Sequence, residues 1–262
     1  MILDSITREK ELRGKLGAMP SPIDKRDYKL TNLMASAPVL APIYEPKIMG
    51  PVLNQGQSSQ CVACSLALVK YIIEKQQTGN VQEFSTNYIY GNRAAEDEKG
   101  EGLYPRQAIK TLVNFGVPHK SETETFLSYN EAVEFYQNNK EVLNREAIPY
   151  RISSYYALYG KNDIKQAIQT IGAVTAMFPV FDSLYDTDTA GIVDYDNSKS
   201  QHNYGYHEMT LIGWNDTKKC WTTQNSWGEN WGNKGLCYLP YNYPIVESWA
   251  MIDVIIEKEL KL

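Results

Sequence analysis

The sequence predicts an α+β protein in which a helical half precedes a sheet half. Two observations support this: apolar residues recur at helical spacing in the first half, and short strand-like runs dominate after Ile148. Helices are expected at about 60–75, 86–96, 105–115, 130–143 and 163–170, and strands at 173–180, 207–214, 220–225, 235–240 and 249–257. We therefore expect an N-terminal extension over 1–20 and one domain over 21–262. Within that domain, the helical half spans about 52–147 and the sheet half about 148–257.

Composition and charge exclude several classes of protein. The chain has 262 residues, of which 43% are hydrophobic and 22% charged, which suffices for a buried core. The net charge of -5 and the lack of a Lys/Arg-rich run argue against a nucleic-acid partner. A mean hydropathy of -0.43 without a long apolar run argues against a membrane span. The first residues mix both signs of charge, so no secretory signal is expected and a cytoplasmic location is favoured.

The four cysteines do not form the pattern of a metal site. Cys61 and Cys64 are three residues apart, but no second close Cys or His pair completes a zinc-ligand spacing. Cys220 and Cys237 lie far along the chain, and a protein of this size needs no disulfide for stability. We therefore expect reduced thiols, no metal and no cofactor.

Cys61 is a candidate nucleophile because it opens the first predicted helix. Ser58 and Ser59 are candidate N-caps, and Gly79 is a candidate end of this helix. A thiolate in the first turn is stabilised by free N–H groups and by the positive end of the helix dipole. Cys64, one turn further along an apolar helix, is interpreted as a structural cysteine.

A thiolate nucleophile needs a base and a third group that orients the base. Of the three histidines, His119 and His202 lie in polar loops and are expected at the surface, whereas His207 opens a predicted strand. Asn225 ends the next strand, so adjacent antiparallel strands can place it beside His207, where its amide would fix the imidazole tautomer. Gln55, six residues before Cys61, is a candidate oxyanion donor.

Three stretches of this sequence resemble the papain family of cysteine peptidases. They are residues 55–65 (QGQSSQCVACS), 102–108 (GLYPRQA) and 225–232 (NSWGENWG), and their order with His207 also matches. The resemblance covers about residues 22–257. It implies a papain-like fold in which the helical half carries the nucleophile Cys61 and the antiparallel sheet half carries His207 and Asn225.

The resemblance also implies roles for individual residues. Cys61 would be the nucleophile, paired as thiolate with imidazolium His207, while Asn225 orients His207. The oxyanion would be held by Gln55 and the Cys61 backbone N–H. Trp227 would shield the His207–Asn225 hydrogen bond and also contact substrate. The other substrate-binding residues would be Glu208 and a wall formed by Gly102, Leu103, Tyr104 and Pro105.

This sequence departs from the family pattern at several positions. Val62 replaces the usual aromatic residue after the nucleophile, and Leu103 replaces a glycine of the substrate wall. Ser58 replaces a cysteine that usually forms a disulfide. The loss of this disulfide fits a reducing compartment, or a bacterial or viral branch of the family. Glu208 stands where a small residue is usual. It either faces the pocket for the second residue upstream of the cleaved bond, favouring basic side chains, or turns away to pair with a Lys or Arg.

The predicted activity is hydrolysis of peptide bonds through a thioester acyl-enzyme, as an endopeptidase or an aminopeptidase on peptide or protein substrates. Two alternatives stay open: a papain-shaped binding protein without catalysis, and a related Cys–His acyl transferase or amidase. The extension over 1–20 either inhibits the enzyme by lying along the cleft, is removed by self-cleavage near Ala18–Ser21, or is a disordered tail.

Overall fold

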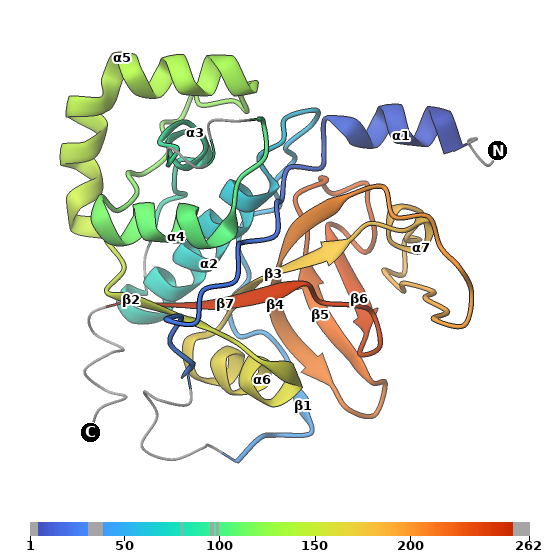
Figure 1. Cartoon of the computed structure of the whole chain (residues 1–262). Coiled ribbons are helices and arrows are strands. Elements are labelled where there is room, and N and C mark those ends of the chain that lie inside the picture. Colours follow the sequence, from blue (N-terminus) through green and yellow to red (C-terminus); the bar gives the residue numbers. More distant parts are fainter. Residues whose placement is uncertain (1–4, 31–38, 80, 95–96, 98–99, 254–262) are drawn as a thin grey trace.

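A computed structural model describes residues 5–30, 39–79, 81–94, 97 and 100–253. The predicted α+β class is confirmed, with a helical half beside an antiparallel sheet (Figure 1). The helical half contains α2 (Cys61–Thr78), α3 (Thr86–Gly91), α4 (Pro105–Asn114) and α5 (Tyr129–Ala147), and a short 3-10 turn, η3 (Ile148–Tyr150), leads into the sheet half. Within the described residues, no helix is long and apolar enough to cross a membrane.

The sheet of the second half has the strand order β2-β7-β3-β4-β5-β6, with β1 also paired to β4. Its strands are β1 (Ile43–Tyr44), β2 (Ser154–Ala157), β3 (Val174–Pro179), β4 (Tyr206–Asn215), β5 (Cys220–Gln224), β6 (Leu236–Pro240) and β7 (Glu247–Ile252). Helix α6 (Gly160–Ile171) packs against β3, β4 and β7. Every named pair of neighbouring strands is antiparallel, so the start of one strand lies beside the end of its neighbour.

Helix α2 is the central element because it packs against both the other helices and the sheet. Its residues are buried without a break from Cys61 to Lys70, as expected for a helix that is apolar on every side. Gly79 ends α2 in the left-handed conformation, with φ of 74°, as the sequence predicts.

The expected capping of α2 by Ser58 and Ser59 is wrong. The N-cap residue is Gln60, without a side-chain capping bond. Ser58 Oγ instead donates to the Gln55 carbonyl at 2.7 Å, and Ser59 Oγ donates to Glu101 at 3.4 Å. The serine hydroxyls therefore tie the preceding turn together and leave the first-turn N–H groups of α2 without a side-chain cap from this turn.

A hydroxyl cluster joins the two halves in the core. Ser65 Oγ on α2 lies 2.7 Å from Thr175 Oγ1 on β3 and 2.9 Å from Thr210 Oγ1 on β4. All three residues are buried, so these hydrogen bonds satisfy groups that would otherwise be costly to bury. The cluster fixes the height at which α2 meets the sheet, and with it the position of Cys61 one turn earlier.

Several boundaries differ from those expected. The helix predicted over 86–96 ends at Gly91, and the one predicted over 130–143 continues to Ala147. The polar loop over 181–206 contains a short helix, α7 (Asp182–Tyr185), that was not predicted. Strand β7 begins two residues before the predicted start at Trp249, and the predicted end at 254–257 lies outside the described residues.

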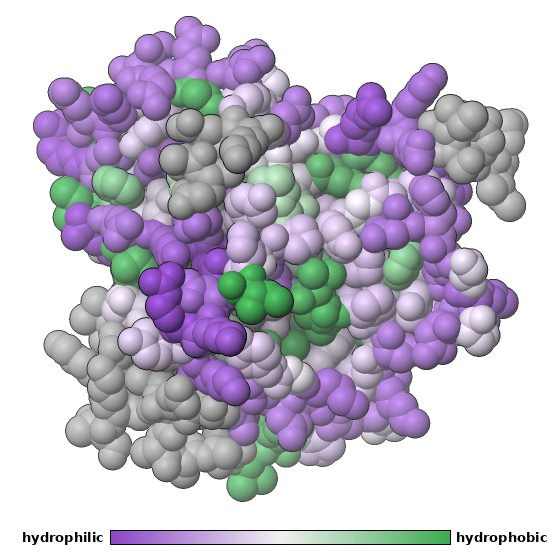
Figure 2. All heavy atoms as spheres, viewed as in Figure 1, coloured by the Kyte–Doolittle hydropathy of each residue, from purple (hydrophilic) through white to green (hydrophobic). Residues whose placement is uncertain are grey.

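The N-terminal part of the chain lies along the boundary between the two halves (Figure 1). Helix α1 (Ser5–Arg13) is followed by an extended segment that runs from near the N-terminal end of α2 towards β2. Figure 2 shows the same face as mostly hydrophilic, with a small hydrophobic patch near its centre. The described part of the extension is thus an ordered element packed on the domain.

Candidate active site

Cys61 is the first residue of α2 and is fully buried. The backbone N–H groups of Glu208 and Gly17 are directed at its sulfur. Burial is the largest influence on the thiol and raises its pKa to about 12, against the opposing effect of these N–H groups. In this covered state Cys61 is a neutral thiol.

His207 lies at the start of β4, one residue before the N–H that points at Cys61. Its Nε2 is 2.7 Å from Asn225 Oδ1, at the end of β5, where the antiparallel pairing of β4 and β5 brings the two together. The Trp227 ring lies 4.6 Å from the His207 ring between centroids and covers this hydrogen bond. Because Nε2 donates to an amide oxygen, the other ring nitrogen, Nδ1, is left to act on a neighbouring group.

Burial favours the neutral form of His207, as it does for Cys61. Burial lowers the pKa of His207 to about 4, and the hydrogen bond that His207 donates to Asn225 opposes this only in part. The Lys15 carbonyl also favours the charged form, although Nδ1 has no full hydrogen bond within the described residues. The expected thiolate–imidazolium pair is therefore not the state that this covered site favours.

Gln55 lies on the turn before α2 and is 1% exposed. Its Oε1 accepts a hydrogen bond of 2.6 Å from Ser226 Oγ, and its Nε2 donates to the Ser58 carbonyl at 2.6 Å. Nε2 also donates to the Lys15 carbonyl at 3.0 Å. These partners fix the amide orientation, so its N–H groups are directed at two backbone carbonyl oxygens.

Cys64 occupies a separate apolar environment formed with Leu53 and Leu68. Burial raises its pKa well above the usual range. Its surroundings are those of a structural cysteine, in agreement with the sequence interpretation.

The N-terminal segment covers the site from Gly14 to Met19. The Leu103 N–H donates to the Gly17 carbonyl at 2.8 Å, and the Met19 N–H donates to the Leu103 carbonyl at 2.9 Å, as in a parallel strand pair. A Cβ on Gly17 would lie 2.0 Å from the Ser59 carbonyl oxygen, and one on Gly14 would lie 2.6 Å from the Gln57 carbonyl oxygen. Both glycines are needed for this close approach.

Helix α1 is held against α7 by charged contacts. Arg8, which is 3% exposed, donates to Asp182 at 2.5 Å and to Asp186 at 2.7 Å, both near α7. Glu11 accepts a hydrogen bond from the Tyr185 hydroxyl. His202 is exposed as expected, and pairs with Glu9 at 3.2 Å.

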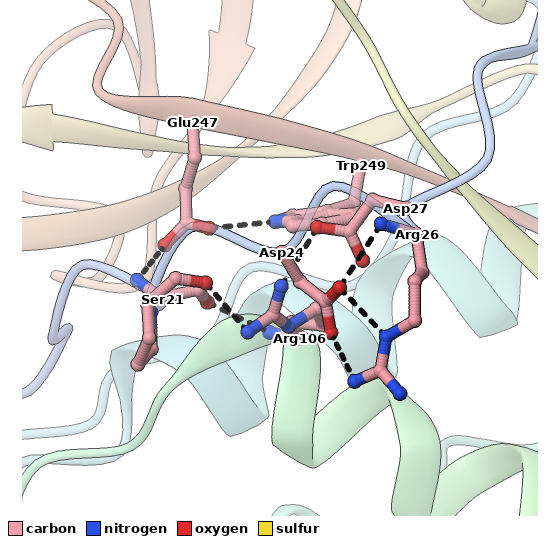
Figure 3. Close-up of polar contacts among 8 residues, drawn as sticks. Ser21, Asp24, Arg26, Asp27, Arg106, Glu247 and Trp249 are labelled. Atoms are coloured by element: carbon pink, nitrogen blue, oxygen red, sulfur yellow. Dashed lines mark hydrogen bonds and ion pairs between the residues drawn. The ribbon is translucent and has the colours of Figure 1, made fainter.

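On the opposite side, the segment Ser21–Asp27 is clasped between α4 and β7 (Figure 3). Arg106 on α4 donates to Asp27 at 2.7 Å and to the Pro22 carbonyl at 2.6 Å. The Ser21 N–H donates to Glu247 on β7 at 3.0 Å. We name this segment the clasp, because it bonds to both halves of the protein.

Of the expected substrate wall, Leu103 lies beside the covering segment, with which it forms backbone hydrogen bonds. Pro105 begins α4, and the Tyr104 N–H donates to Asp97 at 2.8 Å, which fixes the wall formed with Gly102 and Leu103. His119 is half-buried rather than fully solvated as expected, because it stacks on Phe84 and lies tilted against Tyr150. Within the described ranges, no cluster of three metal-ligating residues is present.

Sequence reasoning missed Glu247, Arg106 and the two glycines of the covering segment. The glycine spacing at 14 and 17 was the available signal for a segment that approaches another backbone closely. Glu247 gave no signal, because its place beside the site depends on the pairing of β7 with β3.

Comparison with known proteins places these features in a family. Residues 44–248 match the papain family of cysteine proteases. The chain is 27% identical over 216 residues to an uncharacterized peptidase C1-like protein of Acanthamoeba polyphaga mimivirus, covering 79% of this chain and 69% of that protein. It is 25% identical over 194 residues to cathepsin K of Mus musculus, covering 73% of this chain and 56% of cathepsin K.

Solved structures show the same fold. Xylellain, a cysteine protease from Xylella fastidiosa, superposes with a TM-score of 0.77 at 21% identity, covering 97% of this chain and all of xylellain. Procathepsin B S9 from Trypanosoma congolense superposes with a TM-score of 0.69 at 16% identity, covering 93% of this chain and 88% of that one. The chain belongs to the papain family of cysteine proteases.

Proposed function

We propose that this papain-like peptidase hydrolyses peptide bonds through a thioester acyl-enzyme formed on Cys61. The observation that carries the proposal is the convergence of three elements on one point. Cys61 opens α2, the His207–Asn225 pair comes from β4 and β5, and the Gln55 amide faces the same cleft. Each of these groups has the chemistry that one step of the reaction requires.

In the proposed reaction, Cys61 Sγ attacks the carbonyl carbon of the substrate after its proton has passed to His207 Nδ1. Gln55 Nε2 and the Cys61 N–H stabilise the negative charge on the carbonyl oxygen. Imidazolium His207 then gives its proton to the leaving amine as the C–N bond breaks. Water, deprotonated by neutral His207, attacks the thioester, and the acid product leaves as the thiol is restored.

Labelling with an epoxysuccinyl thiol-protease inhibitor tests this assignment against its alternatives. One adduct on Cys61, together with cleavage of a proteome-derived peptide library, is expected for a peptidase. A folded protein without an adduct would support a binding protein that lacks catalysis. Transfer of an acyl group to an amine without net peptide cleavage would support an acyl transferase.

We further propose that residues Gly14–Met19 inhibit the enzyme by occupying its cleft. Lys15 supplies a carbonyl to Gln55, and Gly17 presents an N–H to Cys61 Sγ. The segment therefore occupies both the proposed oxyanion donor and the space next to the proposed nucleophile. The family match begins at Tyr44, so this covering segment precedes the matched region.

The variant Gly17→Ala tests the inhibition without changing the catalytic groups. Its Cβ would collide with Ser59, so the segment should leave the cleft, and turnover of a peptide substrate should rise above that of the wild type. Gly100→Ala is the matched control, because a Cβ there meets nothing within 4 Å. Equal activity of wild type and Gly17→Ala would show that the segment does not inhibit. Intact mass measured on the same samples reports whether the chain is cut near Ala18–Ser21.

A further inference from the structure

Arg8 occupies a built binding place for a guanidinium group beside α7. Its Nη1 donates to Asp182 Oδ1 at 2.5 Å and to Asp186 Oδ2 at 2.7 Å, and its guanidinium carbon lies 5.1 Å from the centre of the Tyr185 ring. Arg8 is 3% exposed, although the side chains of both aspartates are more than half exposed. Two carboxylates above an aromatic face suit a planar guanidinium better than a compact ammonium. We name Asp182, Asp186 and Tyr185 the arginine seat.

The arginine seat is held in place by residues that do not belong to α1. The Tyr204 hydroxyl donates to Asp182 Oδ1 at 2.9 Å, and Trp231 Nε1 donates to the Tyr185 carbonyl at 3.2 Å. The Asp186 N–H donates to the Asp182 carbonyl at 2.8 Å within the same turn. Because these contacts do not involve α1, the seat keeps its shape when α1 leaves, and its two carboxylates then lack the cation that they hold in this structure.

The order of contacts along the N-terminal chain shows where the arginine seat lies relative to the cleft. From Met19 back to Arg8, these contacts are, in turn, the wall at Leu103, the nucleophile Cys61, the His207 ring and the arginine seat. The Tyr185 ring lies 6.3 Å from the Trp227 ring, which covers His207. In the proposed reaction His207 protonates the leaving amine, so groups beyond His207 face the part of a substrate that follows the cleaved bond. The arginine seat lies on that side, and Figure 1 shows α1 and α7 at the same end of the molecule.

We propose that the arginine seat binds an arginine side chain of the peptide or protein substrate, on the leaving-group side of the cleaved bond, in place of Arg8. This inference rests on the proposed function and names a class of substrate. An incoming guanidinium restores both hydrogen bonds to the aspartates and the contact with Tyr185. A lysine supplies the charge without the planar fork, and an uncharged side chain leaves the two carboxylates without a cation. A substrate with an arginine at this place therefore competes with Arg8 and helps to displace α1.

The test measures kcat/KM of full-length Arg8→Met, in which the seat has lost its own arginine, for a set of peptides. Each peptide carries arginine, lysine or citrulline, the uncharged isostere of arginine, at one of the positions that follow the cleaved bond. At one position arginine should exceed citrulline by about five- to tenfold, with lysine between them. Adding Asp186→Asn should remove most of this ratio. Adding Asp194→Asn instead, which removes the same charge from an exposed position of the same loop, should leave the ratio unchanged.

Hydrogen exchange gives a second measurement that needs no cleavage. In full-length Cys61→Ala, which retains Arg8, the arginine peptide should speed amide exchange in α1 more than the citrulline peptide does. Equal exchange with the two peptides would overturn the displacement of Arg8 from the seat.

The outcomes separate this inference from the proposed function. Cleavage with equal kcat/KM for arginine and citrulline at every position overturns the seat as a substrate site and leaves the peptidase assignment intact. A preference that survives Asp186→Asn does the same. Equal values for arginine and lysine overturn the selection of a guanidinium. Faster exchange of α1 with the arginine peptide, in a protein whose wild type cleaves none of the peptides, would support the seat and overturn the peptidase assignment.

Discussion

The carbonyl oxygen of Lys15 accepts a hydrogen bond of 3.0 Å from Gln55 Nε2. The donor proposed to hold the substrate oxygen is therefore already occupied by the chain's own backbone. The same segment covers Cys61 and excludes water from His207, which accounts for the opposite directions in which burial moves the two pKa values. The covering of Cys61 and His207 by this segment and the shifts of their pKa values thus have the same structural cause.

The two cysteines of α2 should respond differently to substitution. Cys61→Ala should abolish peptide hydrolysis without loss of fold, because the change is small and the helix start does not use the thiol. Cys64→Ala should retain activity but lower the free energy of unfolding by about 1 kcal/mol, since it opens a small cavity beside Leu53 and Leu68. Turnover and denaturant unfolding measured on both variants check this. Loss of activity in folded Cys64→Ala alone would reverse the assignment.

Thiol reactivity should report the covering of Cys61. A pKa of about 12 leaves almost no thiolate at pH 7, so alkylation of the wild type by iodoacetamide should be slow there and rise only at strongly alkaline pH. In Gly17→Ala, water returns to the site, and the Cys61–His207 pair should react well below the usual thiol pKa of about 8.5 and give a bell-shaped activity profile. Rates measured from pH 4 to 10 on both proteins make the comparison. Identical profiles would refute the effect of the segment.

Arg8 should control how firmly α1 is held. Replacing it by methionine removes two ion pairs to half-exposed aspartates, which we expect to cost about 1–2 kcal/mol of docking. The corresponding rise in peptide turnover is roughly 5- to 30-fold, if docking limits activity. Arg145→Met, at the exposed end of α5, is the control and should change nothing. A rise that is equal in both variants would point to a general effect of charge.

Ser65 should contribute to stability through the hydroxyl cluster. Ser65→Ala leaves the buried Thr175 and Thr210 hydroxyls with one partner fewer, and we expect a loss of about 1–3 kcal/mol in the free energy of unfolding. Ser198→Ala, in the exposed part of the 181–206 loop, is a suitable control. Urea denaturation followed by tryptophan fluorescence measures both. An unchanged midpoint in Ser65→Ala would show that the cluster does not couple the two halves.

The fold and the main groups at the site were predictable because local patterns carry them. Helix α2 is apolar on every face, and the motifs around Cys61 and Asn225 are short and contiguous. The expected capping failed because both serine hydroxyls have other partners. Ser58 Oγ donates to the Gln55 carbonyl in the same turn, and Ser59 Oγ donates to Glu101, which is distant in the sequence. The carboxylate at Glu247 depends on strand order, which local sequence does not encode. The cytoplasmic location stays a prediction.

The clasp at Ser21–Asp27 keeps the proposed inhibitory segment, Gly14–Met19, at a high local concentration beside the site. It anchors the chain one residue beyond the Met19–Pro20 link, so Gly14–Met19 is tethered beside the cleft at an effective concentration on the order of millimolar. If the segment inhibits as proposed, even loose contacts keep the site closed, and a free peptide of the same sequence would need comparable concentrations. A single cut before Ser21 would then dilute the inhibitor into the whole solution. Activation by that route would be a one-way step.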